Sequence, residues 1–135
     1  MPVPVLPDVL GVMCQALLGQ SAVTALVGTR ITDRIPDSPI WPLIVVSVVS
    51  EQEKEWHTGS ARVQCDVWGR GPTSVDKLEV RAIFAALVSV SRDLRGAWSS
   101  GRISNSAITN GVMLPDPNTG RQRIAVDFHI ESHAT

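Results

Sequence analysis

The sequence predicts an α+β domain in which a mainly antiparallel β-sheet carries helices on one face. Two segments repeat apolar residues at helical spacing, several short segments are rich in β-branched or alternating apolar residues, and turn signals separate them. The expected order is α-(α)-β-β-β-α-β-β. Consecutive strands joined by turns favour antiparallel pairing, and the length fits one domain over residues 1–135.

The amino-terminal part is predicted to hold two helices. Asp8 is placed to cap the first helix, and Gly19 is expected to end it. Ser21 is then expected to cap a short helical turn over 22–27, closed by Gly28. The first helix has one apolar stripe, formed by Leu6, Val9, Leu10, Met13, Leu17 and Leu18.

The next segments predict three strands. Residues 30–34 form a short strand, and three prolines within 36–42 make the following segment a stiff loop. Residues 43–49 give the strongest strand pattern and are apolar on both faces, so both faces need a cover. Residues 62–67 alternate, with Val63, Cys65 and Val67 inward, and the polar residues 51–60 are expected to connect the two strands as the tip of a long antiparallel hairpin.

The second half predicts a long helix and two strands. The helix is expected over 75–90 behind a capping box at Thr73 and Asp76, and its broad apolar arc predicts burial on more than one side. Residues 103–114 read as a strand whose apolar positions change parity. After a turn at 115–120, the last strand alternates clearly from Ile124 to Glu131.

Composition narrows the function classes. Hydrophobic residues make up 44% and charged residues 19%, which indicates a folded protein, and 12 basic against 13 acidic residues lack the basic surplus of a phosphate-binding protein. Cys14 and Cys65 are expected as buried free thiols. The start of the chain lacks the pattern of a signal peptide, and the apolar run 43–49 is too short for a bilayer, so we expect a soluble intracellular protein without membrane partners.

Chemical motifs are weak, and no catalytic, metal or cofactor-binding residue is assigned. His129 and His133 would lie roughly 13 Å apart on a strand, too far to share a metal. Asp127, His129 and Glu131 share one strand face, which leaves a small-ligand-binding or enzymatic domain as the alternative of another class. The ordinary explanation of that face is the solvated side of an edge strand. The alternating Glu51, Glu53 and Glu55 are explained in the same way, as a solvated loop.

The tryptophans are more informative because they indicate protein contacts. Each of the four lies beside Pro, Gly or polar residues at the end of an element, and Trp is enriched at interfaces. Trp56 is the strongest candidate because charged residues flank it at the hairpin tip. The expected interface residues are Trp56, Glu55, Glu53, Lys54, His57 and Trp41.

Five segments together carry a resemblance to a known family. They are 22–31 (AVTALVGTRI), 33–36 (DRIP), 41–46 (WPLIVV), 63–68 (VQCDVW) and 123–128 (RIAVDF). Their order and spacing, from about residue 10 to 131, resemble the tail-completion or tail-terminator proteins of long-tailed bacteriophages. These motifs are structural, and no family residue is carried over as a catalyst.

The resemblance implies a non-enzymatic virion protein. Its subunits would form a hexameric ring on the head-proximal end of the tail tube, end tube polymerisation and present the surface that the head connector binds. DNA would pass through the ring without being read, so a balanced charge is expected. The implied partners are other copies of the chain, the tail tube protein and a head connector or completion protein, with assembly in the host cytoplasm and, by analogy, a non-contractile tail. A different head–tail adaptor or a minor tail protein is the alternative within this class.

Overall fold

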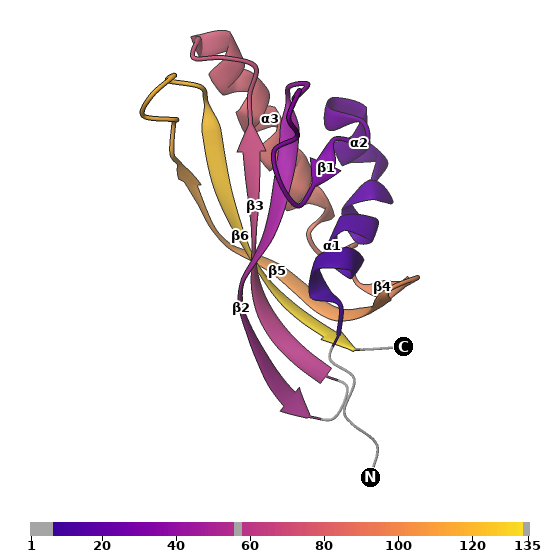
Figure 1. Cartoon of the computed structure of the whole chain (residues 1–135). Helices are drawn as coiled ribbons and strands as arrows, with labels where there is room; N and C mark the ends of the chain where they lie inside the picture. Colours follow the sequence, from indigo (N-terminus) through magenta and orange to yellow (C-terminus); the bar gives the residue numbers. More distant parts are fainter. Residues whose placement is uncertain (1–6, 56–57, 134–135) are drawn as a thin grey trace.

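The computed structural model describes residues 7–55 and 58–133, which form three helices and one six-stranded sheet (Figure 1). The elements are α1 Val9–Leu18, α2 Ser21–Val27, β1 Ile31–Thr32, β2 Leu43–Glu55, β3 Thr58–Trp68, α3 Ser74–Val90, β4 Gly96–Trp98, β5 Gly101–Met113 and β6 Arg123–His133. The predicted α+β class is confirmed, and the elements follow the predicted order with the short strand β4 in addition.

The strands lie in the order β1-β2-β3-β6-β5-β4. All neighbouring pairs are antiparallel except β1 and β2, which run parallel over two residue pairs. Strand β6 lies at the centre of the sheet, between β3 and β5. The prediction that Asp127, His129 and Glu131 belong to an edge strand is therefore wrong, because β3 and β5 pair along the two edges of β6.

The helix boundaries follow their caps. The Asp8 carboxylate accepts a hydrogen bond from the Gly11 amide at 3.0 Å, which confirms the first cap. Helix α2 begins at Ser21 itself, after Gln20, so the prediction that Ser21 is the cap is wrong by one residue. At α3 both hydrogen bonds of the predicted capping box between Thr73 and Asp76 are present.

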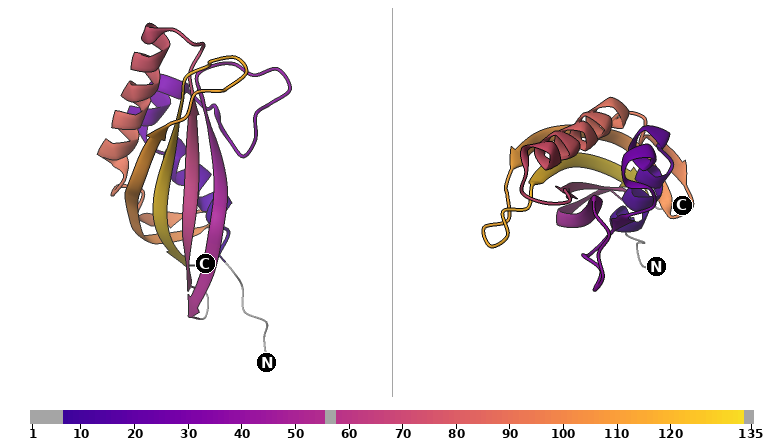
Figure 2. Two further views of the ribbon diagram at one scale, coloured as in Figure 1. Left: turned by 90° about the vertical axis from the view of Figure 1, so that its left-hand side faces the viewer. Right: turned by 90° about the horizontal axis from the view of Figure 1, so that it is seen from above.

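One apolar core lies between the helices and one face of the sheet. Figure 2 shows the helices on one side of the long strands. The inward residues of β3 and β6 alternate with outward ones, as the pattern predicted, and Val63, Cys65 and Phe128 are fully buried. Helices α1 and α3 contribute Met13, Leu17, Ile83 and Leu87 to the same core, which fixes them to the sheet.

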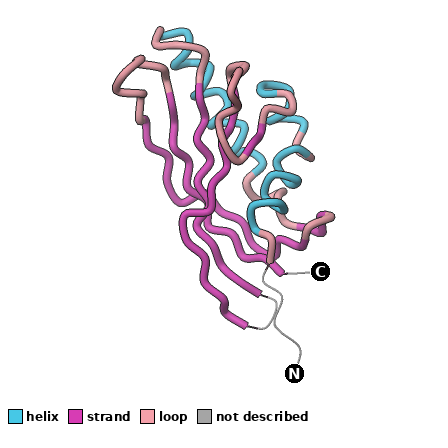
Figure 3. The backbone as a smooth tube through the Cα atoms, in the orientation of Figure 1, coloured by secondary structure: helices cyan, strands magenta, loops and turns pink. Residues whose placement is uncertain are grey.

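The β2–β3 hairpin is antiparallel, as predicted, but its strands are longer. Pairing continues from Leu43↔Trp68 to Glu55↔Thr58, so residues 51–55 belong to β2 and the predicted loop over 51–60 is wrong. Polar residues can continue a strand where its side chains face water, because the backbone ladder supplies the hydrogen bonds. The hairpin carries the two strands to the end of the sheet opposite the loops at 33–42, 69–73 and 114–122 (Figure 3).

Strand β5 explains the change of parity in the sequence. Its register with β6 shifts between Ile103 and Asn105 and again between Ile108 and Asn110. Each bulge adds one residue to the strand, which moves the following side chains to the opposite face. The predicted strand over 103–114 is therefore correct, and its irregular pattern records two bulges.

Candidate functional site

The predicted interface residues lie at opposite ends of the sheet. Glu53, Lys54 and Glu55 are the last residues of β2, while Trp56 and His57 lie outside the described residues. Trp41 lies two residues before the start of β2, at the other end of the strand. The predicted interface residues therefore form two separate groups, with Trp41 a full length of β2 away from Glu53, Lys54 and Glu55.

Trp41 belongs to a stack of four side chains, here called the Trp–Arg ladder: Trp41, Trp68, Arg121 and Arg123. The two indole rings lie 6.3 Å apart at 55°. The guanidinium carbon of Arg121 lies 4.0 Å from the Trp41 ring centroid, and that of Arg123 lies 5.0 Å from the Trp68 centroid. Such contacts combine apolar burial with cation–π attraction. Sequence reasoning marked both tryptophans but missed the two arginines, which lie more than 50 positions further along the chain.

Three loops meet at this ladder. Arg121 Nη1 donates to the carbonyl oxygens of Gly69 and Arg70, and the Gln122 and Gly69 amides donate to the carbonyls of Gly71 and Gln122 at 3.0 and 2.9 Å. The contact between Arg121 and the Trp41 ring joins the proline-rich loop to the other two loops. This end of the sheet is therefore a cross-linked three-loop platform, and exposed apolar residues such as Ile40, at 68% exposure, lie on it.

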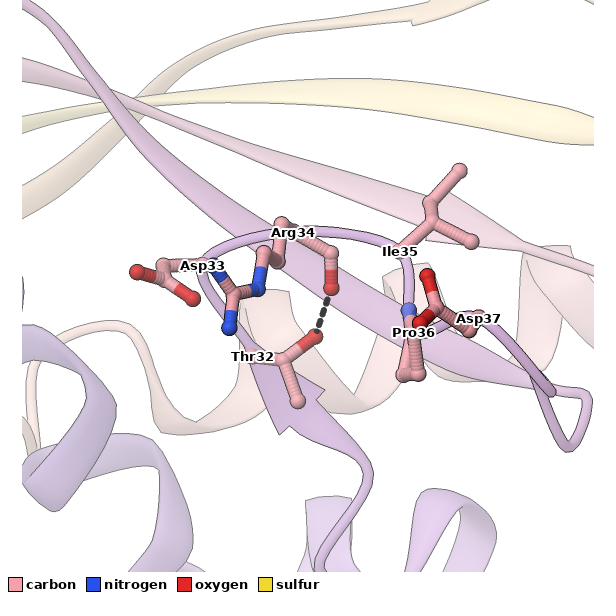
Figure 4. Close-up of a pocket in the computed structure, with 6 residues that line it drawn as sticks. All are labelled: Thr32, Asp33, Arg34, Ile35, Pro36 and Asp37. Carbon is pink, nitrogen blue, oxygen red and sulfur yellow. Dashed lines mark hydrogen bonds between the residues drawn. The ribbon is translucent and has the colours of Figure 1, made fainter.

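A hollow of about 640 Å³ lies at the start of the proline-rich loop (Figure 4). One run of chain from Thr32 to Asp37 lines it, and the Thr32 hydroxyl donates to the Arg34 carbonyl oxygen at 2.6 Å. Asp33 and Asp37 lie at opposite ends of that run in Figure 4, so their carboxylates do not converge. The hollow is the inner side of a turn and shows no arrangement suited to acid–base chemistry.

The sheet face that the helices leave uncovered, here called the open face, carries paired charges. Arg62 on β3 lies 2.8 Å from Asp127 on β6, and Arg123 on β6 lies 2.9 Å from Asp66 on β3. His129 Nε2 lies 3.6 Å from Glu131. Because Asp127 is paired with an arginine and only 9% exposed, the Asp127, His129 and Glu131 row is not a freely solvated face. The diagonal pairing follows from the β3–β6 register, which the sequence did not give.

At each side of the sheet, the outer edge of a long strand, β2 or β5, is paired over only two or three residues. Strand β1 pairs only with Ile44 and Val45 of β2, and β4 pairs only with residues 101–103 of β5. Within the described residues, the rest of β2 and of β5 has a strand on one side only. On the second face of the apolar run 43–49, Leu43 is buried and Val45 is half-buried, whereas Val49 at the bulge is 48% exposed, so the described part of the chain covers only the beginning of that face.

Helix α3 also has an uncovered apolar side. Val75, Leu78 and Val88 are 73%, 67% and 49% exposed. The expected burial of α3 on more than one side is therefore wrong for the single chain, because only its Val80, Ile83, Leu87 and Val90 side meets the sheet.

Cys14 and Cys65 are both free thiols. Burial raises the pKa of Cys65, and burial also raises the pKa of the half-buried Cys14, so both thiols stay protonated at neutral pH. Across residues 7–55 and 58–133, no three His, Cys, Asp or Glu side chains lie together as a metal site would require.

Helices long and apolar enough to cross a membrane singly are absent from the described part of the chain. Helices α1 and α2 meet the criteria of length and composition only as a pair, bent by 86°. Their apolar residues Val12, Met13, Leu17, Val23 and Val27 are buried in the core.

Comparison with known proteins identifies a family and a fold. A family model described as tail completion protein gp17 matches residues 11–131. A chain from the structure titled "Virion of native gene transfer agent (GTA) particle" is similar over 93% of this chain and 95% of that chain, with a TM-score of 0.70 and 18% sequence identity. No curated protein matches the chain in sequence.

Proposed function

The chain belongs to the tail completion protein gp17 family, and from this premise we propose that it caps the head-proximal end of a phage tail tube as a ring. The whole chain, residues 1–135, acts as one ring subunit that ends tube polymerisation and joins the tail to the head connector. Its partners are other copies of itself in a hexameric ring, the tail tube protein and the connector. It works through contacts and not through catalysis, in the host cytoplasm during assembly and then in the virion.

The outer edges of β2 and β5, most of which have no partner strand in the described residues, support this proposal. Along the sheet order each long strand is antiparallel to the next, so β2 and β5, at opposite sides, also run antiparallel to each other. The β5 side of one copy therefore meets the β2 side of the next with the antiparallel alternation unbroken. This contact joins two different surfaces, which is the heterologous geometry that a closed ring needs.

The two ends of the sheet supply the remaining contacts. Figure 1 shows the β2–β3 hairpin extending past α2 and α3, away from the three-loop platform. We assign the hairpin tip, with Trp56, Glu55, Glu53, Lys54 and His57, to a neighbouring subunit or the tube. Trp41 serves the opposite end, where its ladder holds the platform. A ring with a contact surface at each end can meet the tube on one side and the connector on the other.

The test is a tail-assembly reaction with the double variant Trp56→Ala, Glu55→Ala. The matched control is Leu78→Ala, Lys77→Ala, which removes an exposed apolar side chain and its charged neighbour from α3. The hairpin variant should unfold at the same denaturant concentration as the unmodified chain but leave tubes that keep growing beyond their normal length. A hairpin variant that still terminates tubes normally contradicts the assignment of the tip, and normal tubes made without the chain contradict the proposed function.

A further inference from the structure

We propose that the open face lines the DNA passage of the ring, and that its aspartates keep its arginines from binding DNA phosphates. This inference rests on the proposed function. When sheets join side by side in a ring, one face of each sheet must point to the axis. The helices thicken the subunit on the other face (Figure 2), and that face fits the wider outer circumference. The open face, which is polar and free of helices, is then the wall of the passage.

The geometry of the two ion pairs shows how the arginines are occupied. Arg62 reaches across from β3 to Asp127 at 2.8 Å, and Arg123 reaches back from β6 to Asp66 at 2.9 Å. The carboxylate side chains are 12% and 14% exposed, whereas those of Arg62 and Arg123 are 55% and 24% exposed. Each carboxylate is therefore more buried than the arginine side chain that it binds.

Two ion pairs on this face hold four of its described charged residues. Its described charged residues are Arg62, Arg102, Arg123, Asp66, Asp127 and Glu131. An arginine that faces duplex DNA without a partner would bind a phosphate and release a counterion, and several such contacts per ring would hold the DNA. A charge-assisted bond to a carboxylate satisfies the same donors at short range, so little attraction is left for a passing phosphate.

Stability alone does not explain these charges. Asp127 Oδ1 and Arg123 Nε are buried and make no hydrogen bond to residues 7–55 or 58–133. Apolar side chains of similar size at such positions are often at least as stabilising as an ion pair. Paired charges do have a use on a wall that must neither attract nor repel a polyanion. At distances greater than the separation of the two charges, their fields largely cancel, and salt screens the remainder.

The experiment frees the arginines one at a time with near-isosteric changes, Asp127→Asn and Asp66→Asn. Glu79→Gln is the matched control, since it frees Arg70, 3.1 Å away on the helix side, with the same change of charge. Binding of linear duplex DNA is measured from about 50 to 200 mM salt, the range over which phosphate contacts weaken strongly. Each aspartate variant should bind DNA more tightly than the unmodified chain, with a salt slope steeper by about 0.9 for each new phosphate contact. The control should bind like the unmodified chain.

A second variant separates released charge from damage to the fold. Arg62→Gln added to Asp127→Asn removes the freed arginine and should return DNA binding to the original level. Aspartate variants that bind DNA no better than Glu79→Gln overturn the inference, as does tighter binding that Arg62→Gln leaves unchanged. Light scattering on the same samples reports ring formation separately, so aspartate variants that form rings but bind DNA no better than the control overturn this inference alone, whereas an unmodified chain that forms no ring with the tail tube overturns the proposed function as well.

Discussion

The guanidinium of Arg121 lies over the indole ring of Trp41, 4.0 Å from its centroid, and connects two loops that are separated by most of the chain. Arg121 Nη1 also donates to the Gly69 carbonyl oxygen at 3.1 Å. One side chain therefore ties together the loop before β2, the loop after β3 and the loop before β6. The end of the sheet proposed to meet a partner is thus ordered before the partner arrives, which lowers the entropic cost of binding.

Arg121→Ala should loosen this platform without unfolding the sheet. The lost cation–π contact and hydrogen bonds should lower the free energy of unfolding by about 1–2 kcal/mol. Faster hydrogen exchange should appear in residues 33–42 and 69–73, measured by mass spectrometry. Arg95→Ala, which removes an exposed arginine, is the control. Exchange in the two loops that stays as slow as in this control would show that Arg121 does not order them.

Gly111→Ala should destabilise the packing of α3 on β5. A Cβ at Gly111 would lie 2.7 Å from Cζ of Phe84, too close for two carbon atoms. Overpacking of this kind should cost about 1–3 kcal/mol of unfolding free energy, measured by urea denaturation. Phe84→Leu shortens the opposing side chain, so the double variant should lose less than the sum of the two single losses. Additive losses would mean that the two residues do not meet.

Val49→Lys should weaken ring formation while the subunit stays folded. Val49 lies at the bulge of β2 on the side proposed to meet β5 of the next copy, and a lysine there opposes strand pairing between chains. Val88→Lys on α3 is a matched control, because Val88 and Val49 are 49% and 48% exposed. Light scattering and negative-stain microscopy should show fewer rings for Val49→Lys only. Equal loss in both variants would point away from the sheet edge.

Acidic pH should lower the stability that the capping box gives to the first turn of α3. Hydrogen bonds from the Thr73 hydroxyl and amide lower the pKa of Asp76 below its ordinary range. Since the folded pKa is the lower one, this contribution to stability is complete above the unfolded pKa, about 3.9, and is lost as the pH falls through the folded value. Asp76→Asn should therefore flatten the fall of unfolding free energy at acid pH. If the unfolding free energy of Asp76→Asn falls at acid pH as steeply as that of the unmodified chain, the capping box does not contribute to stability in this way.

The sequence predicted the regular elements well because their signals are local. Helix caps at Asp8 and Thr73 and the alternation around Val63 depend on neighbours within a few positions, and all three were confirmed. The irregular elements depend on pairing between distant segments. The bulges of β5 and the continuation of β2 through Glu55 are set by the registers with β6 and β3, which one strand alone does not encode.

The candidate surfaces divide in the same way. Trp41 was recognised from its position beside prolines at an element end, but its contact with Arg121 required the fold. Asp127 was noticed as part of a charged row, yet its pairing with Arg62 depends on β6 lying at the centre of the sheet. Residue type thus indicated which side chains matter, and topology determined what they touch.

Hydrogen exchange on the assembled ring shows whether copies of the chain join through the outer sides of β2 and β5. Backbone amides on an unpaired strand edge exchange with water, and pairing with another chain protects them. Relative to the free subunit, we expect slower exchange in residues 46–53 and 104–113 together, with little change in β3 and β6, which are paired on both sides already. Rings in which both outer strands exchange as fast as in the free subunit would contradict this expectation.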